Sequence, residues 1–525
     1  MIWTRSSIFA GGTYLALLLA LSLLAARRRE TPSQFLNASG SLPLWVCIAA
    51  SIAANCGSLD VIAMTALGAQ YGMIACHFYW IGAVPALIAV AFWLMPAYAR
   101  RGFPTVLDFI EHYYGERTRL AVALCMAAMM LLLCGVCLSA VAQTMMVFAG
   151  WRFATGALAT AVLVLLYTWI GGLRGTIYTE LLHFTVVLAA VTPLLFLILH
   201  DFGGPSKLFA QFPADHRFAW RMLPVFAPGA TMDVAGVVCG LGVVLGFGYW
   251  STDFVQMQRM LAVRNRADAP LIPLSLAGAR IAFAFLIVWP GIAAPLVLSR
   301  APASNWNATL PALMEHYYNP FWMAIGVMGL VASLISTYAR NVSAFSAAWM
   351  QGVYHPSVRR ELTNDRLVWM ARLSNAAVVL LSIGAAYWAL SYQSLMESIQ
   401  TVLSIFNAPL FALVALVAVA PRLSANGGMA GLLTGIGSAL AHELMVQAGL
   451  LHYGSRMSAA FYAAILSFCV TAMVTMMASA LRAARSEAAP SSEHGDRLRM
   501  SFSIPVLAWA VIVGGCCLLI NILLR

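Results

Sequence analysis

The chain contains about fourteen apolar stretches, each roughly as long as a membrane-spanning helix. A helix needs about 20 apolar residues to cross the hydrocarbon core of a bilayer, which is about 30 Å thick. The stretches are continuous, whereas the strands of a membrane barrel alternate in polarity over about ten residues. We therefore predict an all-α integral membrane protein. Its predicted spans are 7–26, 44–73, 74–98, 120–149, 155–170, 176–200, 230–256, 271–298, 320–350, 367–390, 395–420, 428–450, 457–481 and 503–524.

Composition and charge exclude several classes of protein. Hydrophobic residues make up 62% of the 525 residues and charged residues only 9%, whereas soluble domains carry about 25% charged residues. A soluble fold could not bury so much apolar surface, so a soluble enzyme and a disordered chain are excluded. The net charge of +11 comes from scattered basic residues, without the dense patch of a nucleic-acid-binding protein. The sequence also lacks a convergent His, Asp and Glu cluster, so we expect no enzyme activity.

The basic residues divide unequally between the two sides of the predicted bundle. Loops of one side hold nineteen of them and segments of the other side hold eight. Because basic loops stay in the cytoplasm, both chain termini are predicted to lie outside. Arg27, Arg28 and Arg29 follow the first apolar stretch, which indicates a retained helix rather than a signal peptide. We expect a multi-pass protein of the cell (inner or plasma) membrane, surrounded by lipid.

Two of the predicted spans are interrupted. Span 44–73 carries Asn55, Gly57 and Asp60 near its middle, and span 230–256 is rich in glycine before Tyr249. Unpaired backbone at membrane depth is tolerated where it lines a cavity. The interruptions lie five spans apart, which is typical of an inverted-repeat transporter with discontinuous helices and a site at the bilayer midplane. The predicted organisation is an extra helix at 1–30, a first five-helix repeat at 44–200, a second at 230–420, and three peripheral helices at 428–525.

The ninth predicted span combines hydroxyl groups with a charge. Ser336 and Thr337 are adjacent, and Arg340 follows one turn later. A hydroxyl on a membrane helix often donates a hydrogen bond to the backbone carbonyl four residues earlier, and this is one interpretation of both Ser336 and Thr337. The other is a sodium site, because hard cations take oxygen ligands and a broken helix supplies carbonyl groups.

Four segments of the sequence are distinctive when taken together: AANCGSLDVIAM, WIGGLRGTIYTELLHF, GYWSTDFVQMQRMLAVRN and STYARNVSAFSAAWMQGVY. They resemble the sodium/solute symporter family, which includes the sodium–glucose and sodium–proline cotransporters. The resemblance covers nearly the whole chain. It implies fourteen helices, a five-plus-five inverted repeat and Na⁺ as the coupling ion.

The resemblance also implies site residues. The sodium site would use carbonyls of Ala53, Cys56 and Ser333 and hydroxyls of Ser336 and Thr337. Glu180 falls on the ion exit path. Tyr249 falls where an aromatic gate lies beneath the substrate, and Arg280 where a lysine contacts it. The remaining substrate positions are Asn55, Asp60, Tyr79, Gly246 and Thr401, so the family's sugar-reading side chains are mostly absent and only Asn55 is kept.

Charges inside predicted spans are costly and usually functional, and three of them carry alternative interpretations. Asp60 either caps the helix that restarts after the break or contacts substrate. Arg280 either pairs with Asp60 or Asp253, or contacts a substrate carboxylate or hydroxyl. Arg340 either acts as a surrogate cation or snorkels to the cytoplasmic edge. At 4 Å and an effective dielectric of about 20, two unit charges repel by about 4 kcal/mol, so the surrogate interpretation implies weakened sodium dependence.

These observations predict a secondary active transporter. It would take up a small polar organic solute, sugar-like or an organic acid, together with Na⁺ by alternating access, and act as a monomer without nucleic acid. Two alternatives remain open. One is a sodium-independent transporter or exchanger in which Arg340 replaces the ion. The other is a non-transporting sensor or interaction protein on the same fold, although residues 482–502 offer only a linker where a signalling domain would be expected.

Overall fold

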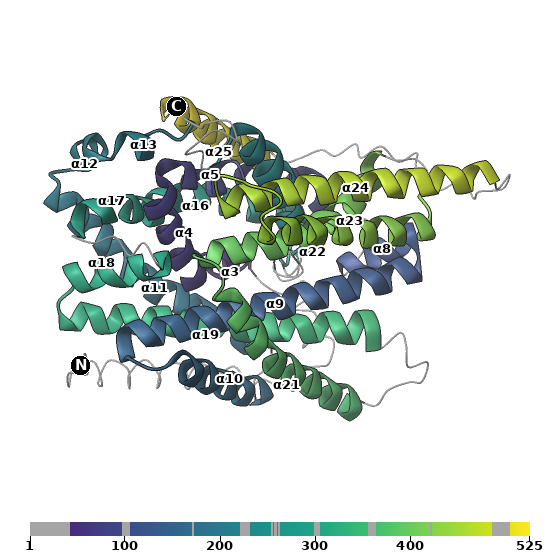
Figure 1. Cartoon of the computed structure of the whole chain (residues 1–525), viewed down its shortest axis with the longest axis horizontal. Coiled ribbons are helices and arrows are strands. Elements are labelled where there is room, and N and C mark those ends of the chain that lie inside the picture. The colour runs from purple at the N-terminus through teal and green to yellow at the C-terminus, as the bar shows by residue number, and fades with distance from the viewer. Residues whose placement is uncertain are drawn as a thin grey trace.

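The computed structural model of the chain is a bundle of helices (Figure 1). It describes residues 43–96, 105–170, 173–220, 232–253, 256, 260, 263–298, 305–354, 364–419, 423–485 and 504–524. Within these ranges it contains no β-strand. Ten helices there are long and apolar enough to cross a membrane, and three shorter apolar helices accompany them. The first predicted span and the segment 1–30 lie outside the described residues, so the count of fourteen stays a prediction.

The first predicted interruption is a break between two helices. Helix α3 (Leu44–Asn55) ends at Cys56, and α4 (Ser58–Tyr71) begins after the extended Gly57. The two helices lie inside the bundle, where Figure 1 draws them in purple. A Cβ atom built on Gly57 would lie 3.3 Å from Thr337 Oγ1 and 3.4 Å from Ser333 Oγ. The absence of a side chain at Gly57 therefore lets the break approach the ninth span closely.

The second predicted interruption is a different structure. Residues Gly236–Gly246 form a π-helix, η3, which continues into α14 (Phe247–Thr252). The prediction of a break among these glycines was therefore wrong, because the chain stays helical until Asp253. The glycines serve close packing instead. A Cβ on Gly246 would lie 2.3 Å from the carbonyl oxygen of Gly82, and one on Gly240 would lie 2.7 Å from Phe461 Cβ.

The other helices follow the predicted spans. Helix α19 (Pro320–Trp349), the ninth span, packs against α9 (Glu116–Ala149), α11 (Leu173–Asp201) and α4. The remaining helices of the bundle include α6 (Val84–Ala89), α10 (Phe153–Ile170), α16 (Leu271–Phe283), α17 (Trp289–Val297), α21 (Asn364–Ala389), α22 (Leu395–Val419), α23 (Ala425–Gln447), α24 (Arg456–Arg485) and α25 (Ile504–Leu523). Between spans, α12 (Pro205–Gln211) and α18 (Thr309–Tyr317) are short connecting helices.

Close backbone contact fixes α4 in place. A Cβ on Gly291 of α17 would lie 2.1 Å from the carbonyl oxygen of Thr65 on α4. Thr65 itself donates a hydrogen bond to the carbonyl of Ile287, at 3.1 Å. Lipid is as apolar as the helix surfaces, so the hydrophobic effect does not drive membrane helices together. Close packing at small residues and hydrogen bonds between helices hold them instead. The half of the broken helix that carries Asp60 is therefore rigidly supported.

Candidate solute and sodium sites

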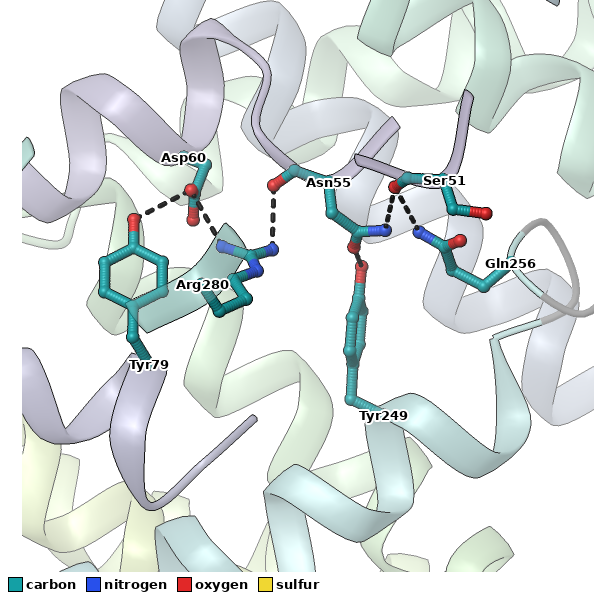
Figure 2. A network of polar contacts seen from close by, with 7 residues as sticks. All are labelled: Ser51, Asn55, Asp60, Tyr79, Tyr249, Gln256 and Arg280. Atoms are coloured by element: carbon teal, nitrogen blue, oxygen red, sulfur yellow. Dashed lines mark hydrogen bonds and ion pairs between the residues drawn. The ribbon is translucent and has the colours of Figure 1, made fainter. Parts of the chain in front are cut away.

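An ion pair lies beside the break. Asp60, in the first turn of α4, accepts from Arg280 Nη1 of α16 at 3.0 Å. The second terminal nitrogen of Arg280 donates to the carbonyl of Asn55, the last residue of α3, at 2.8 Å (Figure 2). A helix C-terminus carries partial negative charge, so the guanidinium meets two favourable groups. Arg280 thus joins the two halves of the broken helix, and of the two predicted partners the structure selects Asp60.

Two aromatic rings enclose the guanidinium. Tyr79 donates its hydroxyl proton to Asp60 Oδ2 at 2.8 Å, and its ring lies 5.1 Å from the Arg280 guanidinium carbon. The Trp250 ring lies 5.4 Å from the same atom. Such distances are those of cation–π contacts. Arg280 is 6% exposed, and its Nε has no hydrogen-bond partner among the described residues.

The polar network continues past Tyr249. Its hydroxyl donates to Asn55 Oδ1 at 3.2 Å, and Asn55 Nδ2 donates to the carbonyl of Ser51 at 3.1 Å. Gln256 Nε2 reaches the same carbonyl at 3.3 Å (Figure 2). The structure therefore brings together five of the predicted substrate residues: Asn55, Asp60, Tyr79, Tyr249 and Arg280. We call these five residues the cradle.

Sequence reasoning missed three residues of this network. Trp250 directly follows Tyr249, and the paired aromatics were the available signal. Ser51 and Gln256 are 205 positions apart and meet through a backbone carbonyl. A carbonyl leaves no mark in the sequence, so their contact was not predictable.

The break also meets hydroxyl groups of α19. The backbone N–H of Ser58 donates to Ser333 Oγ at 3.0 Å, and the Ser58 hydroxyl lies 3.4 Å from the carbonyl of Gly329. Thr337 donates to the carbonyl of Ser333, four residues back, at 2.9 Å. The local interpretation is thus correct for the hydroxyl proton of Thr337, and the oxygen of this hydroxyl accepts a long hydrogen bond from Arg340 Nη2 at 3.5 Å. Ser336 is half-buried, and Ala53 and Cys56 are buried at the break.

These groups suit sodium chemically. Hydroxyl and carbonyl oxygens are hard ligands, which hard cations prefer. No group of three or more His, Cys, Asp or Glu suited to a metal ion occurs in the described part of the chain, so an oxygen site built from neutral groups is the candidate. Its neighbour is a charge: Arg340 Nη2 lies 3.5 Å from Thr337 Oγ1. The guanidinium is therefore directed back toward this site.

Thr401 is not joined to these sites by a described contact, and the position of the Glu180 side chain is not described. Thr401 is buried on α22 and donates to the carbonyl of Glu397, at 2.9 Å. This bond within its own helix is the local alternative for a hydroxyl. Glu180 belongs to α11, but its side chain lies outside the described part of the structure.

Comparison with known families decides the class of protein. The sequence profile of the sodium:solute symporter family matches residues 35–435. The chain belongs to the sodium:solute symporter family. It is 23% identical over 406 residues to the sodium/glucose cotransporter of Vibrio parahaemolyticus, covering 70% of this chain and 72% of that protein. It is also 23% identical to sodium/glucose cotransporter 1 of Oryctolagus cuniculus, covering 80% of this chain and 69% of the relative.

Solved structures share the fold. A Na⁺-coupled sialic acid symporter in a substrate-bound outward-open state superposes with a TM-score of 0.75 at 16% identity, covering 93% of this chain and 99% of that one. Mhp1, a nucleobase-cation-symport-1 family transporter, gives a TM-score of 0.55 at 12% identity, covering 88% of this chain and 98% of Mhp1.

Family membership confirms several predictions. The symporter is an all-helical, multi-pass membrane protein and not an enzyme. It is a sodium-coupled secondary transporter of a small-molecule solute, working by alternating access, with Na⁺ as the coupling ion. This result sets aside both the sodium-independent alternative and the non-transporting sensor.

Proposed function

We propose that the cradle binds a small neutral polar solute, with a sugar-like molecule ahead of an organic acid. The observation that carries the proposal is the 3.0 Å ion pair between Asp60 and Arg280. Because the carboxylate balances the guanidinium, the pair adds no net charge to the cradle. An organic acid would have to displace Asp60 from Arg280, whereas a neutral solute leaves the pair intact.

Unused hydrogen-bonding capacity supports a hydroxyl-bearing solute. Arg280 Nε is a buried donor with no described partner, and a buried donor without an acceptor is unfavourable. A solute hydroxyl can accept a hydrogen bond from Arg280 Nε and donate its own proton to Asp60. The rings of Tyr79 and Tyr249 offer apolar faces for the carbon skeleton, and Tyr249 is the proposed gate. The sodium/glucose cotransporters among the relatives are consistent with this class.

We propose that sodium binds where the break meets α19. Carbonyls of Ala53, Cys56 and Ser333 and hydroxyls of Ser336 and Thr337 would hold it, and Glu180 would lie on its exit path. An ion at this position ties the break to α19 and thereby fixes Asn55 and Asp60, which flank it in sequence. Sodium should thus strengthen solute binding, and linkage requires the solute to strengthen sodium binding equally.

Topology and assembly remain part of the proposal. The distribution of basic loops supports both termini outside the cell membrane. A monomer without nucleic acid is the proposed working unit. The five-plus-five inverted repeat, at 44–200 and 230–420, accounts for the position of the break five spans before α14.

A thermal-shift screen of the purified protein tests the proposed solute class. The panel is hexoses, sugar acids, monocarboxylates and amino acids, each with and without sodium chloride, with choline chloride as the matched salt. We expect a hexose to raise the melting temperature only in sodium, because a ligand of the native state stabilises it by mass action. If a monocarboxylate stabilises the protein and no neutral solute does, the argument from the balanced ion pair is wrong.

Arg340 should weaken sodium binding. Its guanidinium lies 3.5 Å from Thr337 Oγ1. Two like unit charges about 4 Å apart repel by about 1 kcal/mol even at the dielectric constant of bulk water. We expect Arg340→Gln to lower the sodium concentration for half-maximal uptake by about fivefold or more. Arg340→Lys keeps the charge and is the control. Equal sodium curves for wild type and Arg340→Gln would mean that the side chain does not act on the ion.

A further inference from the structure

A second polar cavity lies away from the cradle. Its volume is about 620 Å³, and it is bordered by the end of α4, the start of α22 and the segments that follow α21 and α23. Binding pockets for small organic molecules have about this size, whereas a bare ion needs far less space. In the proposed orientation the cavity faces the outside. None of the cradle residues lines it.

Two acceptor atoms at this cavity lack a side-chain donor. Glu397 is 2% exposed; its carboxylate interacts with the backbone N–H groups of Gln393 and Ser394 at the start of α22, and its Oε2 has no side-chain donor among the described residues. Its other oxygen accepts from Gln70 Nε2 at 3.3 Å and from the Tyr71 hydroxyl at 3.2 Å. The amide oxygen of Gln70 is likewise buried without a described donor. The two unpaired acceptors belong to side chains that contact each other, so one ligand with several donors can satisfy both.

The charge of the cavity disfavours an anion. Glu443 pairs with Arg456 at 3.1 Å, and this pair is balanced. Glu397 makes no salt bridge with any residue in the described ranges. Its place in the first turn of α22 makes its negative charge tolerable, because the helix N-terminus is partly positive. Glu397 is therefore an acidic group of the wall without a described ion-pair partner.

Aromatic rings complete the lining. Tyr71, Tyr392 and Tyr453 line the cavity, and each hydroxyl is held by a neighbouring side chain: those of Tyr71 and Tyr392 by glutamates and that of Tyr453 by His442. Tyr453 also stacks on Tyr462, and Tyr392 contacts Trp388 edge-on, so a ligand would contact the sides of these rings that border the cavity. A carboxylate among aromatic rings is the arrangement that recognises organic cations.

We propose that this cavity binds a small organic ammonium compound. Glu397 and Gln70 accept its N–H groups, and the tyrosine rings cover its carbon atoms. The proposal is independent of which solute the cradle takes, because the two sites share no residue.

Calorimetric titration of the full-length purified protein tests this site, with ethanolamine as the probe. Ethylene glycol matches its size without charge, tetramethylammonium has charge without N–H donors, and acetate is an anion. We expect saturable binding of ethanolamine, at least tenfold weaker binding of ethylene glycol and tetramethylammonium, and none of acetate, because charge-assisted hydrogen bonds are the strong ones. Absence of ethanolamine binding, or equal affinity for ethylene glycol, would overturn the proposal.

Variants locate the binding site. Glu397→Gln keeps the shape and should weaken ethanolamine binding at least tenfold, and Gln70→Ala should weaken it severalfold even if the first variant folds poorly. Glu315→Gln removes an exposed carboxylate on α18 and should change nothing. Asp60→Asn combined with Arg280→Gln removes both charges of the cradle without leaving one unpaired, and it should bind ethanolamine as the wild type does. Binding that is lost in this double variant but kept in Glu397→Gln would place the ammonium in the cradle and refute the second site.

Discussion

Replacing Arg280 with glutamine should abolish sodium-dependent solute binding and lower the free energy of unfolding by about 3–5 kcal/mol, the usual cost of removing one partner of a buried ion pair. Arg280 is 6% exposed and binds both Asp60 and the carbonyl of Asn55. Without it, the half-buried Asp60 carboxylate keeps only the Tyr79 hydroxyl as a described partner. Thermal unfolding in detergent and solute uptake by proteoliposomes measure the two effects.

A double variant separates folding from binding. Asp60→Asn combined with Arg280→Gln removes both charges, so no unpaired charge remains, and it should be more stable than Arg280→Gln alone. It should still fail to bind solute, because the cradle has lost the donor and acceptor that the solute needs. Wild-type stability together with wild-type uptake in Arg280→Gln would show that the pair neither supports the break nor contacts the solute.

Replacing Thr337 with alanine should raise the sodium concentration for half-maximal uptake by about tenfold or more. The change removes an oxygen that lies beside the break and leaves the α19 backbone intact. Losing one oxygen ligand to a cation costs about as much as losing a charge-assisted hydrogen bond, which is 1.5–3 kcal/mol. Uptake measured over a range of sodium concentrations gives the shift.

Control variants test whether the effect comes from the ion. Thr337→Ser keeps the hydroxyl and should retain near-normal sodium dependence. Ser343→Ala removes another α19 hydroxyl, whose hydrogen bond among the described residues is to the carbonyl of Ala339 in its own helix, and it should be silent. If Ser343→Ala and Thr337→Ala shift the sodium curve equally, the loss reflects general weakening of α19 and not an ion ligand.

The sequence correctly predicted the helix break at Cys56 and Gly57, and it wrongly predicted a second break among the glycines of η3. Around Cys56 and Gly57, polar residues interrupt an apolar span, and backbone exposed at that depth must line a site. The glycines of η3 give the same signal at the level of sequence. Their role depends instead on what lies opposite, namely Gly82 and Phe461, and this is a property of packing. A glycine in a membrane span can therefore indicate either close packing of two helices or a break in one helix. The residues that face it in the fold decide between the two.

The same limit applies to the charged residues. A charge in an apolar span indicates function, so Asp60, Arg280 and Arg340 stood out. Their partners followed only in part. The sequence offered Asp60 or Asp253 as the partner of Arg280, and the pair with Asp60 and the bond to the Asn55 backbone are seen only in the structure. Glu397 escaped notice because it lies near the start of a span, where a glutamate is an ordinary first-turn residue. Its burial and the cavity before it are visible only in three dimensions.

Direct binding of radioactive sodium to the purified protein tests most sharply whether the helix break and α19 together form the ion site. Saturable binding by the wild-type chain, loss of that binding in Thr337→Ala and its retention in Ser343→Ala are the predicted results. Undiminished sodium binding by the Thr337→Ala variant would contradict the account, because the ion would then be held elsewhere.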